Sequence, residues 1–212
     1  MTEFFLFRHG ETDWNSTGRM QGSIDIPLNA LGTAQAQAMC AFFDELTAKF
    51  PNRKELAKSV VSSHLGRAHH TARLALRLSD DEAKNIRIDE RFAETCLGKA
   101  EGLTRAELAV NFGEQSWLDW ISLGEESWHA KFPNGETKGE VRDRALAALE
   151  ELSKEGRPMW FVATHGGLLR RLLHHYHPGV TVPIDVGNGS VFKFIFDKGI
   201  WSVNPHPVFV PA

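Results

Sequence analysis

The sequence predicts an α/β fold: a three-layer sandwich in which helices flank a mostly parallel, doubly wound sheet. Three short apolar runs, at 4–7, 58–63 and 160–164, each stop at a polar segment, as buried strands do. After the second and third runs the apolar spacing becomes helical, over 65–78 and 166–175. Repeated alternation of strand and helix is typical of parallel sheets, whose ligands bind beyond the carboxyl ends of the strands.

Start signals and turn residues predict the remaining elements. Asn29 can cap a helix that runs to about Lys49 through an Ala- and Gln-rich stretch. Two T-x-x-E capping boxes begin helices at Thr104 and at Thr137, and the second of these helices should end near Lys154. A C-terminal hairpin follows, with strands at 191–196 and 200–203, a turn at 197–199 and an extended tail over 205–212.

Length and composition indicate one domain over residues 1–212. With 42% hydrophobic and 24% charged residues, the chain can bury a core of ordinary size. The sequence contains neither an internal repeat nor a linker long enough to separate two domains. We expect the middle of the chain, about 100–136, to form a helical insertion that covers part of the functional site.

Charge and cysteine content indicate which binding partners and which cellular compartment to expect. A formal net charge of -3 provides no basic excess for nucleic acid or for an anionic membrane, so we expect neither partner. The apolar run at 4–7 is too short for a signal peptide or a membrane span, which predicts a cytoplasmic protein. Cys40 and Cys96 form no CxxC motif and are expected to be reduced, packed thiols.

The segment Arg8-His9-Gly10 places a cation and an imidazole at the end of the first predicted strand. Gly10 has no Cβ and would let the backbone turn sharply without obstructing a pocket. An anion could be held and attacked there. An Arg-His pair at a strand end can equally be no more than a polar rim, so this segment alone leaves both interpretations open.

A second segment, His165-Gly166-Gly167, repeats this arrangement after the strand at 160–164. Its glycines open a helix, whose free N–H groups and positive dipole end suit a phosphate. The same glycines could instead serve only to pack the helix against the strand. If the sheet is parallel, the strand ends meet in one crevice, which would gather Arg8, His9, Arg67 and His165.

Taken together, these motifs resemble the histidine phosphatase superfamily, branch 1, which includes the cofactor-dependent phosphoglycerate mutases. That family has an Arg-His-Gly segment near its N-terminus and a second His later in the chain. The resemblance extends from about Phe4 to Leu173. Further matching positions follow in the same order: Asn15, Gly18 to Gly22, Pro27-Leu28, Gly32, Gln35-Ala36, Ser62-Ser63, Arg67-Ala68, Thr71-Ala72, Glu94, Gly98, Glu101-Gly102 and Gly135-Glu136.

The resemblance implies a role for each matching residue. His9 would form a covalent phosphohistidine, and Glu94 would act as general acid and then as general base. Arg8, Arg67 and His165 would hold the transferring phosphoryl group. A neutral imidazole can attack phosphorus without a metal when fixed cations balance the charge, so we expect neither a metal nor another cofactor. The residues implied to contact the substrate are Asn15, Gln21, Gly22 and Gly166.

The sequence is compatible with three functions, and the composition of the middle of the chain ranks them. A mutase needs extra cations and a closing lid for a small acidic substrate. From residue 108 to 136 the chain has no Arg, a single Lys, and the tryptophans Trp117, Trp120 and Trp128. We therefore predict a phosphatase that hydrolyses phosphate monoesters of small metabolites, ahead of mutase-type phosphoryl transfer and of a binder without catalysis. The tryptophans could form an apolar lid or pack the middle helices onto the body.

A cluster of imidazoles near the end of the helix at 166–175 is the remaining candidate for a site. His174, His175 and His177 could bind a metal, but neither an HExxH motif nor a cysteine accompanies them. We expect a partly exposed helix end instead. The natural substrate and the oligomeric state are open on the sequence, a homodimer being one outcome.

Overall fold

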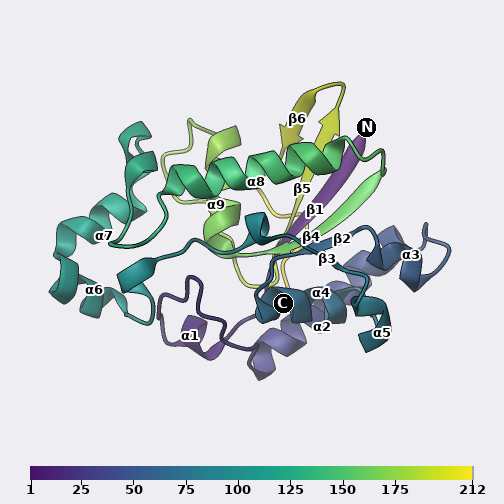
Figure 1. The fold of residues 1–212 in the computed structure, drawn as a ribbon, viewed down its shortest axis with the longest axis horizontal. Helices are drawn as coiled ribbons and strands as arrows, with labels where there is room; N and C mark the ends of the chain where they lie inside the picture. Colours follow the sequence, from purple (N-terminus) through teal and green to yellow (C-terminus); the bar gives the residue numbers. More distant parts are fainter. Residues whose placement is uncertain (212) are drawn as a thin grey trace.

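A six-stranded sheet crosses the part of the chain that the computed structural model describes, residues 1–211 (Figure 1). Four neighbouring strands run in parallel, and the last two are antiparallel to their neighbours. The predicted mostly parallel, doubly wound sheet is therefore confirmed. The strand order is β3 (Arg87–Ile88), β2 (Val60–Ser62), β4 (Met159–Thr164), β1 (Thr2–Arg8), β5 (Val191–Asp197) and β6 (Ile200–Val203).

Helices cover both faces of the sheet and create a hydrophobic core on each side. α2 (Ala30–Thr47) and α4 (Gly66–Ala75) pack on one face, and α8 (Lys138–Ser153) and α9 (Gly166–Tyr176) pack on the other. The two cores contain alternate side chains of β1: Phe4 and Leu6 on the α8–α9 side, Phe5 and Phe7 on the α2–α4 side.

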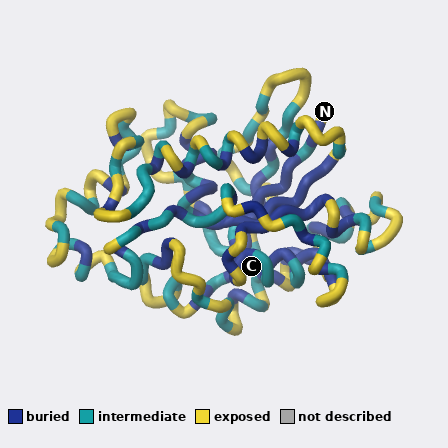
Figure 2. The backbone as a smooth tube through the Cα atoms, in the orientation of Figure 1, coloured by how far each residue is buried: buried dark blue, intermediate teal, exposed yellow. Residues whose placement is uncertain are grey.

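Burial on both faces explains why the run at 4–7 is continuously apolar rather than alternating. Each of its four side chains is at most 2% exposed. Complete burial of such a side chain contributes about 1.5–3 kcal/mol to the free energy of unfolding. Figure 2 shows the result as a dark blue sheet inside an exposed rim. The sheet therefore provides a rigid base for the residues that follow its strands.

Most predicted elements form, with shifted ends. The helix capped by Asn29 is α2, where the Asn29 side chain accepts a hydrogen bond from the backbone N–H of Gly32 (2.8 Å), and the helix ends at Thr47. The helix predicted over 65–78 is α4, which ends early because Arg77 takes a left-handed φ of 50°. The strand predicted over 58–63 is reduced to β2.

The apolar pattern of the sequence does not predict several short elements. They are α1 (Asp13–Ser16), α3 (Arg53–Ala57), α5 (Asp80–Ala83), the edge strand β3, and the 3₁₀ turns η1 (Glu90–Phe92), η2 (Gly98–Ala100) and η3 (Glu125–His129). Each of these helices has five residues or fewer. An apolar period of 3.6 residues cannot repeat over so short a span, so hydrophobic spacing carries no signal for them.

The middle segment at 100–136, which we call the cover, lies to one side of the sheet, at the left of Figure 1. The Thr104 capping box begins α6 (Arg105–Phe112) as predicted. Gly113, with a φ of 81°, separates this helix from α7 (Glu114–Ile121). With the turn before it, the cover has a small hydrophobic core of its own, made by Leu97, Ala100, Leu108, Trp120 and Phe132.

The C-terminal hairpin forms as predicted, with β5 and β6 joined at Lys198-Gly199. The tail then returns to the sheet, where Val191 and Phe209 form an antiparallel bridge. The tail bends at residues 205, 206 and 208, so the extended tail predicted over 205–212 is observed only around Phe209, and residue 212 lies outside the described residues. Within residues 1–211, no helix combines the length and the apolar character needed to cross a membrane.

Candidate active site

Two imidazoles meet where β1 and β4 end. Arg8 and Thr164 are paired in the sheet, so His9 and His165 are the next residues on neighbouring parallel strands. The backbone N–H of His9 donates to the carbonyl of Thr164 (3.0 Å), which extends the ladder by one bond. The ring centres of His9 and His165 lie 5.2 Å apart. The expected meeting of the two segments is therefore observed.

His9 has a defined tautomer. Its Nδ1 lies 2.7 Å from the carbonyl oxygen of Gly10. A carbonyl only accepts, so Nδ1 must carry the hydrogen and Nε2 must keep its lone pair. Burial, followed by the charges of Arg8 and Arg67, lowers the pKa of His9 well below its ordinary value. The residue is thus a neutral imidazole with a free Nε2.

His165 is completely buried beside it. Its Nε2 lies 2.9 Å from the hydroxyl of Ser63, which already accepts a hydrogen bond from the backbone N–H of Leu65. The hydroxyl hydrogen can then be donated to Nε2, and in that arrangement the ring hydrogen of His165 is on Nδ1. Within residues 1–211, this Nδ1 has no partner. Burial and the charge of Arg67 lower the pKa of His165 well below its ordinary value.

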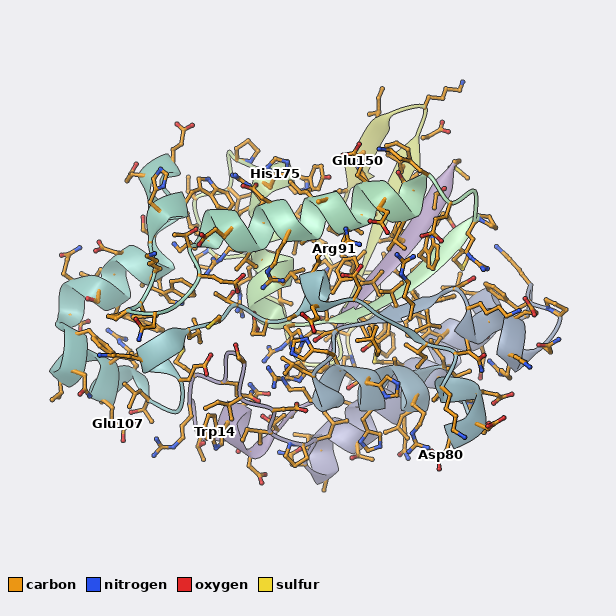
Figure 3. The ribbon with its side chains drawn as sticks, viewed as in Figure 1. Trp14, Asp80, Arg91, Glu107, Glu150 and His175 are labelled. Carbon is orange, nitrogen blue, oxygen red and sulfur yellow. The ribbon has the colours of Figure 1, made fainter. Side chains whose placement is uncertain are left out.

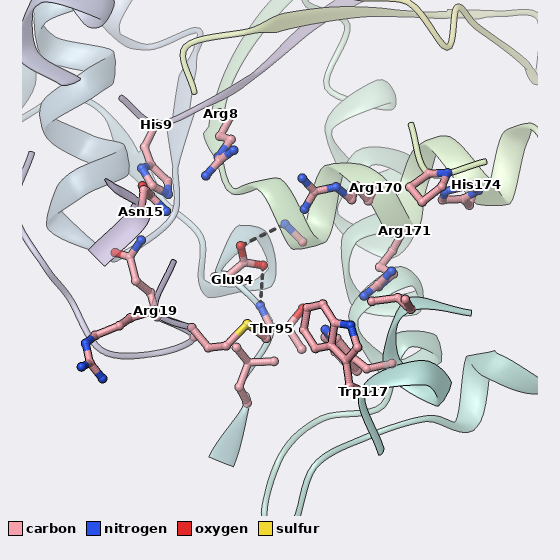
Figure 4. A pocket seen from close by; sticks show the side chains of 18 of the residues that line it. Arg8, His9, Asn15, Arg19, Glu94, Thr95, Trp117, Arg170, Arg171 and His174 are labelled. Carbon is pink, nitrogen blue, oxygen red and sulfur yellow. Dashed lines mark hydrogen bonds between the residues drawn. The ribbon is translucent and has the colours of Figure 1, made fainter. Parts of the chain in front are cut away.

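A cavity of about 400 Å³ opens in front of His9 (Figure 4). A volume of this size is typical of small-molecule sites, which span roughly 300–1,000 Å³. His165 and Gly166 are not among the residues that line the cavity, although the ring of His165 lies beside that of His9. The other predicted site residues all line the cavity: Arg8, His9, Asn15, Gln21, Gly22, Arg67 and Glu94.

Two guanidinium groups approach the cavity from opposite elements. Arg8 ends β1, and its Nη1 donates to the carbonyl of Val186 (2.7 Å). Arg67 lies in the first turn of α4, and its Nη2 donates to the carbonyl of Gly22 (2.8 Å). Both Nε atoms are buried and have no partner in the described chain. Burial lowers the pKa of Arg8 to about 10, so the group stays charged at neutral pH.

The loop with Gln21 and Gly22 is held in place by Arg67 and by a residue that the sequence did not indicate. Asp25 accepts hydrogen bonds from the backbone N–H groups of Gly66 (2.6 Å) and Arg67 (3.3 Å). It thereby caps α4, whose own N-cap, Leu65, has no side-chain hydrogen bond. The same carboxylate pairs with the Arg67 guanidinium at 3.4 Å. Loop and helix are therefore fixed together at the cavity.

Asn15 presents its amide group to the same space. Its Oδ1 lies 3.2 Å from the backbone nitrogen of Thr12 and 3.2 Å from the side-chain nitrogen of Asn188. Both contacts use the oxygen, so the amide nitrogen of Asn15 keeps its hydrogens for a ligand. The position of Asn15 in the third residue of α1 follows from the Thr12 capping box.

Glu94 is held by two backbone N–H groups, drawn as dashed lines in Figure 4. Its Oε1 accepts from Thr95 (2.8 Å) and its Oε2 accepts from Gly167 in the first turn of α9 (2.9 Å). A Cβ at position 167 would overlap with this carboxyl group. Gly167 is thus required for the placement of Glu94, a role that the two alternatives weighed for the glycine pair did not include.

Arg144 of α8 fixes the backbone around Glu94. Its guanidinium donates to the carbonyls of Arg91 (2.7 Å), Ala93 (2.9 Å) and Glu94 (3.2 Å). The carboxylate of Glu136 binds the same guanidinium at 2.8 and 3.0 Å. Figure 3 shows Arg91 beneath α8 at one end of this segment. Sequence reasoning missed Arg144, because carbonyl acceptors leave no mark in a sequence.

The role expected for Gly10 needs correction. Gly10 does not have a positive φ, and a Cβ there would overlap with the backbone of Gly32 at the start of α2. Likewise, a Cβ on Gly32 would overlap with the backbone of Glu11. The two glycines therefore allow the His9 loop and α2 to pack closely. Neither a sharp turn nor an open pocket is the reason for Gly10.

The end of the cavity farthest from His9 is built by residues that the sequence analysis did not select as site residues. Arg171 and His174 of α9 line it, and Arg170 lies between them and Arg8. Arg171 and His174 lie four and seven residues after Gly167, which is the spacing of one helix face. That periodicity, counted from the predicted glycine pair, would have found them. The absence of arginines from residue 108 to 136 was therefore an incomplete measure of the charge in the pocket.

The histidine cluster also differs from expectation. His174 is only 9% exposed and faces the cavity, whereas His177 bonds the carbonyl of Val203 (2.9 Å) and His175 is exposed. The predicted partly exposed helix end is therefore confirmed for His175 and His177 and wrong for His174. No group of three His, Cys, Asp or Glu side chains gathers around a metal-sized position in residues 1–211. Both cysteines of the chain are free, Cys40 being buried and Cys96 half-buried.

The three tryptophans of the cover separate into two kinds. Trp117 and Trp120 line the cavity, and Trp120 also packs on Phe132 with ring centres 5.2 Å apart. Trp128 lies outside the cavity wall, under the guanidinium of Arg142 (4.6 Å). The lid and packing interpretations therefore both apply to Trp120.

We use two names for the halves of this pocket. The phosphoryl end consists of Arg8, His9, Arg67, Glu94 and His165, and the distal end consists of Trp117, Trp120, Arg171 and His174. Arg170 lies between the two ends, where its charge lowers the pKa of Arg8. Five arginines line the cavity against one carboxylate, that of Glu94. An α/β sheet whose strand ends present paired imidazoles among fixed cations defines a class of protein, the phosphoryl-transfer enzymes that use a histidine.

Comparison with known proteins gives the family within that class. The family model of the histidine phosphatase superfamily (branch 1) matches residues 4–206, and the chain belongs to this superfamily. A glucosyl-3-phosphoglycerate phosphatase from Mycolicibacterium vanbaalenii is 35% identical over 181 residues, which is 79% of this chain and 70% of that protein. A probable phosphoglycerate mutase GpmB from Escherichia coli is 32% identical over 170 residues, or 78% and 70%.

Solved structures agree with this assignment. Bacillus stearothermophilus YhfR superposes with a TM-score of 0.76 at 28% identity, over 96% of this chain and 95% of that one. A mycobacterial glucosyl-3-phosphoglycerate phosphatase in complex with VO3 has the same fold, with a TM-score of 0.75 at 24% identity, over 96% and 98%. The resemblance and the predicted class of enzyme, a phosphatase of this superfamily, are confirmed.

Proposed function

We propose that the chain hydrolyses phosphate monoesters of small metabolites through a phosphohistidine on His9, with Glu94 as general acid and base. The observation that carries this proposal is the buried, neutral imidazole of His9, whose Nε2 lone pair is free while Nδ1 is fixed on Gly10. Arg8 and Arg67 line the same cavity and would balance the charge of the phosphoryl oxygens. An activated nucleophile among fixed cations suits phosphoryl transfer.

The reaction would proceed in two displacements. Nε2 of His9 forms a bond to phosphorus while the bond to the ester oxygen breaks, and the leaving oxygen takes its proton from the carboxyl group of Glu94. Water then attacks phosphorus and gives a proton to Glu94, the N–P bond breaks, and inorganic phosphate leaves. Glu94 returns to its protonated form, so protons balance over the cycle.

The other predicted residues would bind rather than react. Asn15 has free amide hydrogens for a phosphoryl oxygen. Nδ1 of His165 is a buried nitrogen without a partner, in a ring whose centre lies 5.2 Å from that of His9. Gly166 begins α9, where a Cβ would come within 3.1 Å of Arg8 Nε, so its small size keeps that guanidinium in place. Gln21 and Gly22 belong to the loop that Arg67 holds, and they would contact the organic part of the substrate.

Hydrolysis of p-nitrophenyl phosphate in the presence of excess chelator tests this proposal. We expect turnover in chelator and loss of turnover in His9→Ala. Quenching with base during turnover should trap phosphate on the protein as a base-stable, acid-labile phosphohistidine. Loss of activity in chelator would contradict a metal-free reaction. Undiminished activity of His9→Ala would contradict the assigned nucleophile.

Mutase-type transfer is the second candidate, because Arg170 and Arg171 provide the additional cations that such a reaction needs. Hydrolysis is preferred since the cavity is wide enough for water beside the substrate. Incubation of 3-phosphoglycerate with 2,3-bisphosphoglycerate decides between them. Release of phosphate without 2-phosphoglycerate is expected, and efficient isomerisation would reverse the assignment.

The proposal has three further parts: location in the cytoplasm, a single domain with a cover at 100–136, and formation of a homodimer. Cell fractionation checks the location, and sedimentation checks the assembly.

A further inference from the structure

The distal end contains a buried cation that the proposed reaction does not use. Arg171 is 8% exposed, and its Nε has no partner in the described residues. No carboxylate of residues 1–211 forms an ion pair with it, and the charge of Glu94, which raises the pKa of Arg171, does not outweigh the effect of burial. Burial lowers its pKa to about 10, so it is charged at neutral pH. Burying a charge without a counterion is costly, and such a group calls for a ligand.

Lys138 provides the contrast that identifies Arg171 as unusual. Both basic groups lie against the ring of Trp120, Lys138 Nζ at 5.7 Å and the guanidinium carbon of Arg171 at 4.9 Å, but burial lowers the pKa of Lys138 to about 7. Lys138 is 1% exposed, but its Nζ donates to the carbonyls of Asp119 (3.2 Å) and Ser122 (2.7 Å) at the end of α7. Fixing α7 accounts for the burial of Lys138. Stacking on Trp120 alone leaves the N–H donors of Arg171 unused.

The position of Arg171 relates it to the chemistry. It lies one turn of α9, about 6 Å along the helix axis, beyond Gly167, whose N–H holds Glu94. His174 lies on the same face, nine-tenths buried, and its Nε2 also has no partner within residues 1–211. Figure 4 shows Arg171 and Trp117 on the far side of Glu94 from His9.

The cavity has room for a substrate that extends this far. A phosphate group has five heavy atoms, and at about 30 Å³ for each water-sized atom these fill less than half of the available volume. The cavity measures about 400 Å³ and is continuous from His9 to His174. The remainder would hold the organic part of a substrate and whatever group meets Arg171.

We propose that Arg171, with His174 beside it, binds a second anionic group of the substrate about one helix turn beyond the scissile phosphoryl group. The preferred substrates are then phosphate esters that also carry a carboxylate or a second phosphate. The planar fork of Arg171 can pair with two oxygens of such a group, and the Trp120 ring holds that fork in one plane. This inference rests on the proposed function and names the substrate class of the same site.

Pairs of esters that differ only in this charge test the proposal. At short reach the pair is 3-phosphoglycerate and glycerol 3-phosphate, and at longer reach it is 4-carboxyphenyl phosphate and 4-carbamoylphenyl phosphate. In the wild type we expect kcat/KM to favour the acid of at least one pair by about 10- to 100-fold, as a charge-assisted hydrogen bond allows. Arg171→Gln should abolish that preference while the uncharged ester of the pair changes little.

The matched control is Arg142→Gln, which removes a guanidinium stacked on Trp128 outside the cavity. This variant should keep the wild-type preference. Equal losses for both esters in Arg171→Gln, or a wild-type ratio near one in both pairs, would overturn the proposal. The wild-type ratio needs no variant, so misfolding of Arg171→Gln cannot hide the answer.

Failure of the proposed function gives a different result. If the wild type hydrolyses none of these esters, nor p-nitrophenyl phosphate, the reaction is wrong. The subsite is then decided by calorimetric titration of 3-phosphoglycerate and glycerol 3-phosphate into the wild type and into Arg171→Gln. Tighter binding of the acid that depends on Arg171 supports the subsite. Equal binding of the two ligands, or no binding of either, refutes it.

Discussion

The two ends of the pocket are built in different ways. At the phosphoryl end, hydrogen bonds to the backbone or to Ser63 hold every functional side chain: His9 by Gly10, Arg8 by Val186, and Glu94 by Thr95 and Gly167. Both ends keep buried nitrogens without a partner, but at the distal end no hydrogen bond within residues 1–211 fixes the side chain of Arg171 or His174, and Arg171 is held by stacking on Trp120. The phosphoryl end is therefore preorganised without a ligand, whereas the polar groups of the distal end remain available to bind one.

This difference follows from the elements that carry each end. Three residues of the phosphoryl end, Arg8, His9 and His165, end or follow β1 and β4, which are buried on both faces and cannot shift without breaking ladder hydrogen bonds. Arg67 on α4 and the Glu94 loop are bonded to the backbone around them. The distal end lies between α9 and the cover, whose small core joins five buried residues. Preorganised dipoles accelerate a reaction because they need no reorganisation as charge develops. The residues that would react with every ester are thus positioned by the sheet and the backbone around it, and the residues that would select among esters are positioned by α9 and the cover.

The largest expected effect is at the phosphoryl end. Glu94→Gln removes the proton that the leaving oxygen needs, and we expect kcat to fall by about 10²- to 10⁴-fold for alkyl phosphates. The loss should be much smaller for p-nitrophenyl phosphate, whose leaving group needs no proton. Steady-state rates for both esters check this. Equal losses for the two would mean that Glu94 binds the phosphoryl group instead of protonating the leaving oxygen.

A smaller effect is expected when the support of Glu94 is removed. Arg144→Ala leaves three backbone carbonyls without their side-chain donor and removes the ion pair of Glu136, which keeps only its hydrogen bond from the backbone N–H of Cys96. We expect kcat to fall by about 10- to 100-fold, because a misplacement of about 1 Å has such a cost, while KM changes little. Arg144→Lys should recover part of the loss. The control is Arg87→Ala, which removes ion pairs of Glu151 and Glu155 that are far more exposed.

A lower melting temperature with an unchanged kcat in Arg144→Ala would contradict the positioning role of Arg144. Such a result would assign Arg144 to stability alone. It would also weaken the contrast between the two ends, since Glu94 would then keep its position through Thr95 and Gly167 only.

The buried imidazoles predict how the protein responds to acid. The pKa values of folded His9 and His165 are lowered well below 6.5, chiefly by burial, so below pH 6.5 the unfolded chain binds protons that the folded chain does not. The free energy of unfolding should therefore fall with pH, by up to about 1.4 kcal/mol per pH unit for each imidazole, until the folded pKa is reached. Above pH 6.5 neither group contributes to the pH dependence.

Urea denaturation at pH 7, 6 and 5 measures this slope, and His165→Asn should reduce it. Because His9 stays neutral, kcat/KM corrected for ionisation of the substrate should show no decline centred near pH 6.5 in the folded enzyme. A midpoint there would mean that His9 titrates like a solvated imidazole, and the phosphoryl end would then be less enclosed than its geometry indicates.

The sequence predicted the phosphoryl end better than the distal end, and the reason is physical. His9 and His165 follow apolar runs whose ends are visible locally, and the rule for parallel sheets brings those ends together. Arg144 and Asp25 act on backbone groups far away in the chain, which no local pattern encodes. Arg171 was missed because cations were counted along the chain between 108 and 136, whereas the pocket gathers them across α9.

The smallest expected effect separates the two kinds of tryptophan in the cover. Trp120→Phe keeps most of the apolar area against Phe132 but weakens the stacking that holds Arg171, which is worth roughly 0.5–2 kcal/mol in such pairs. We expect a loss of about two- to fivefold in kcat/KM for acidic esters and little change for p-nitrophenyl phosphate, measured across the same ester pairs. Trp128→Phe, outside the cavity wall, should leave relative turnover unchanged. An equal response of the two variants would assign both rings to packing, and the distal end would then owe its selectivity to α9 alone.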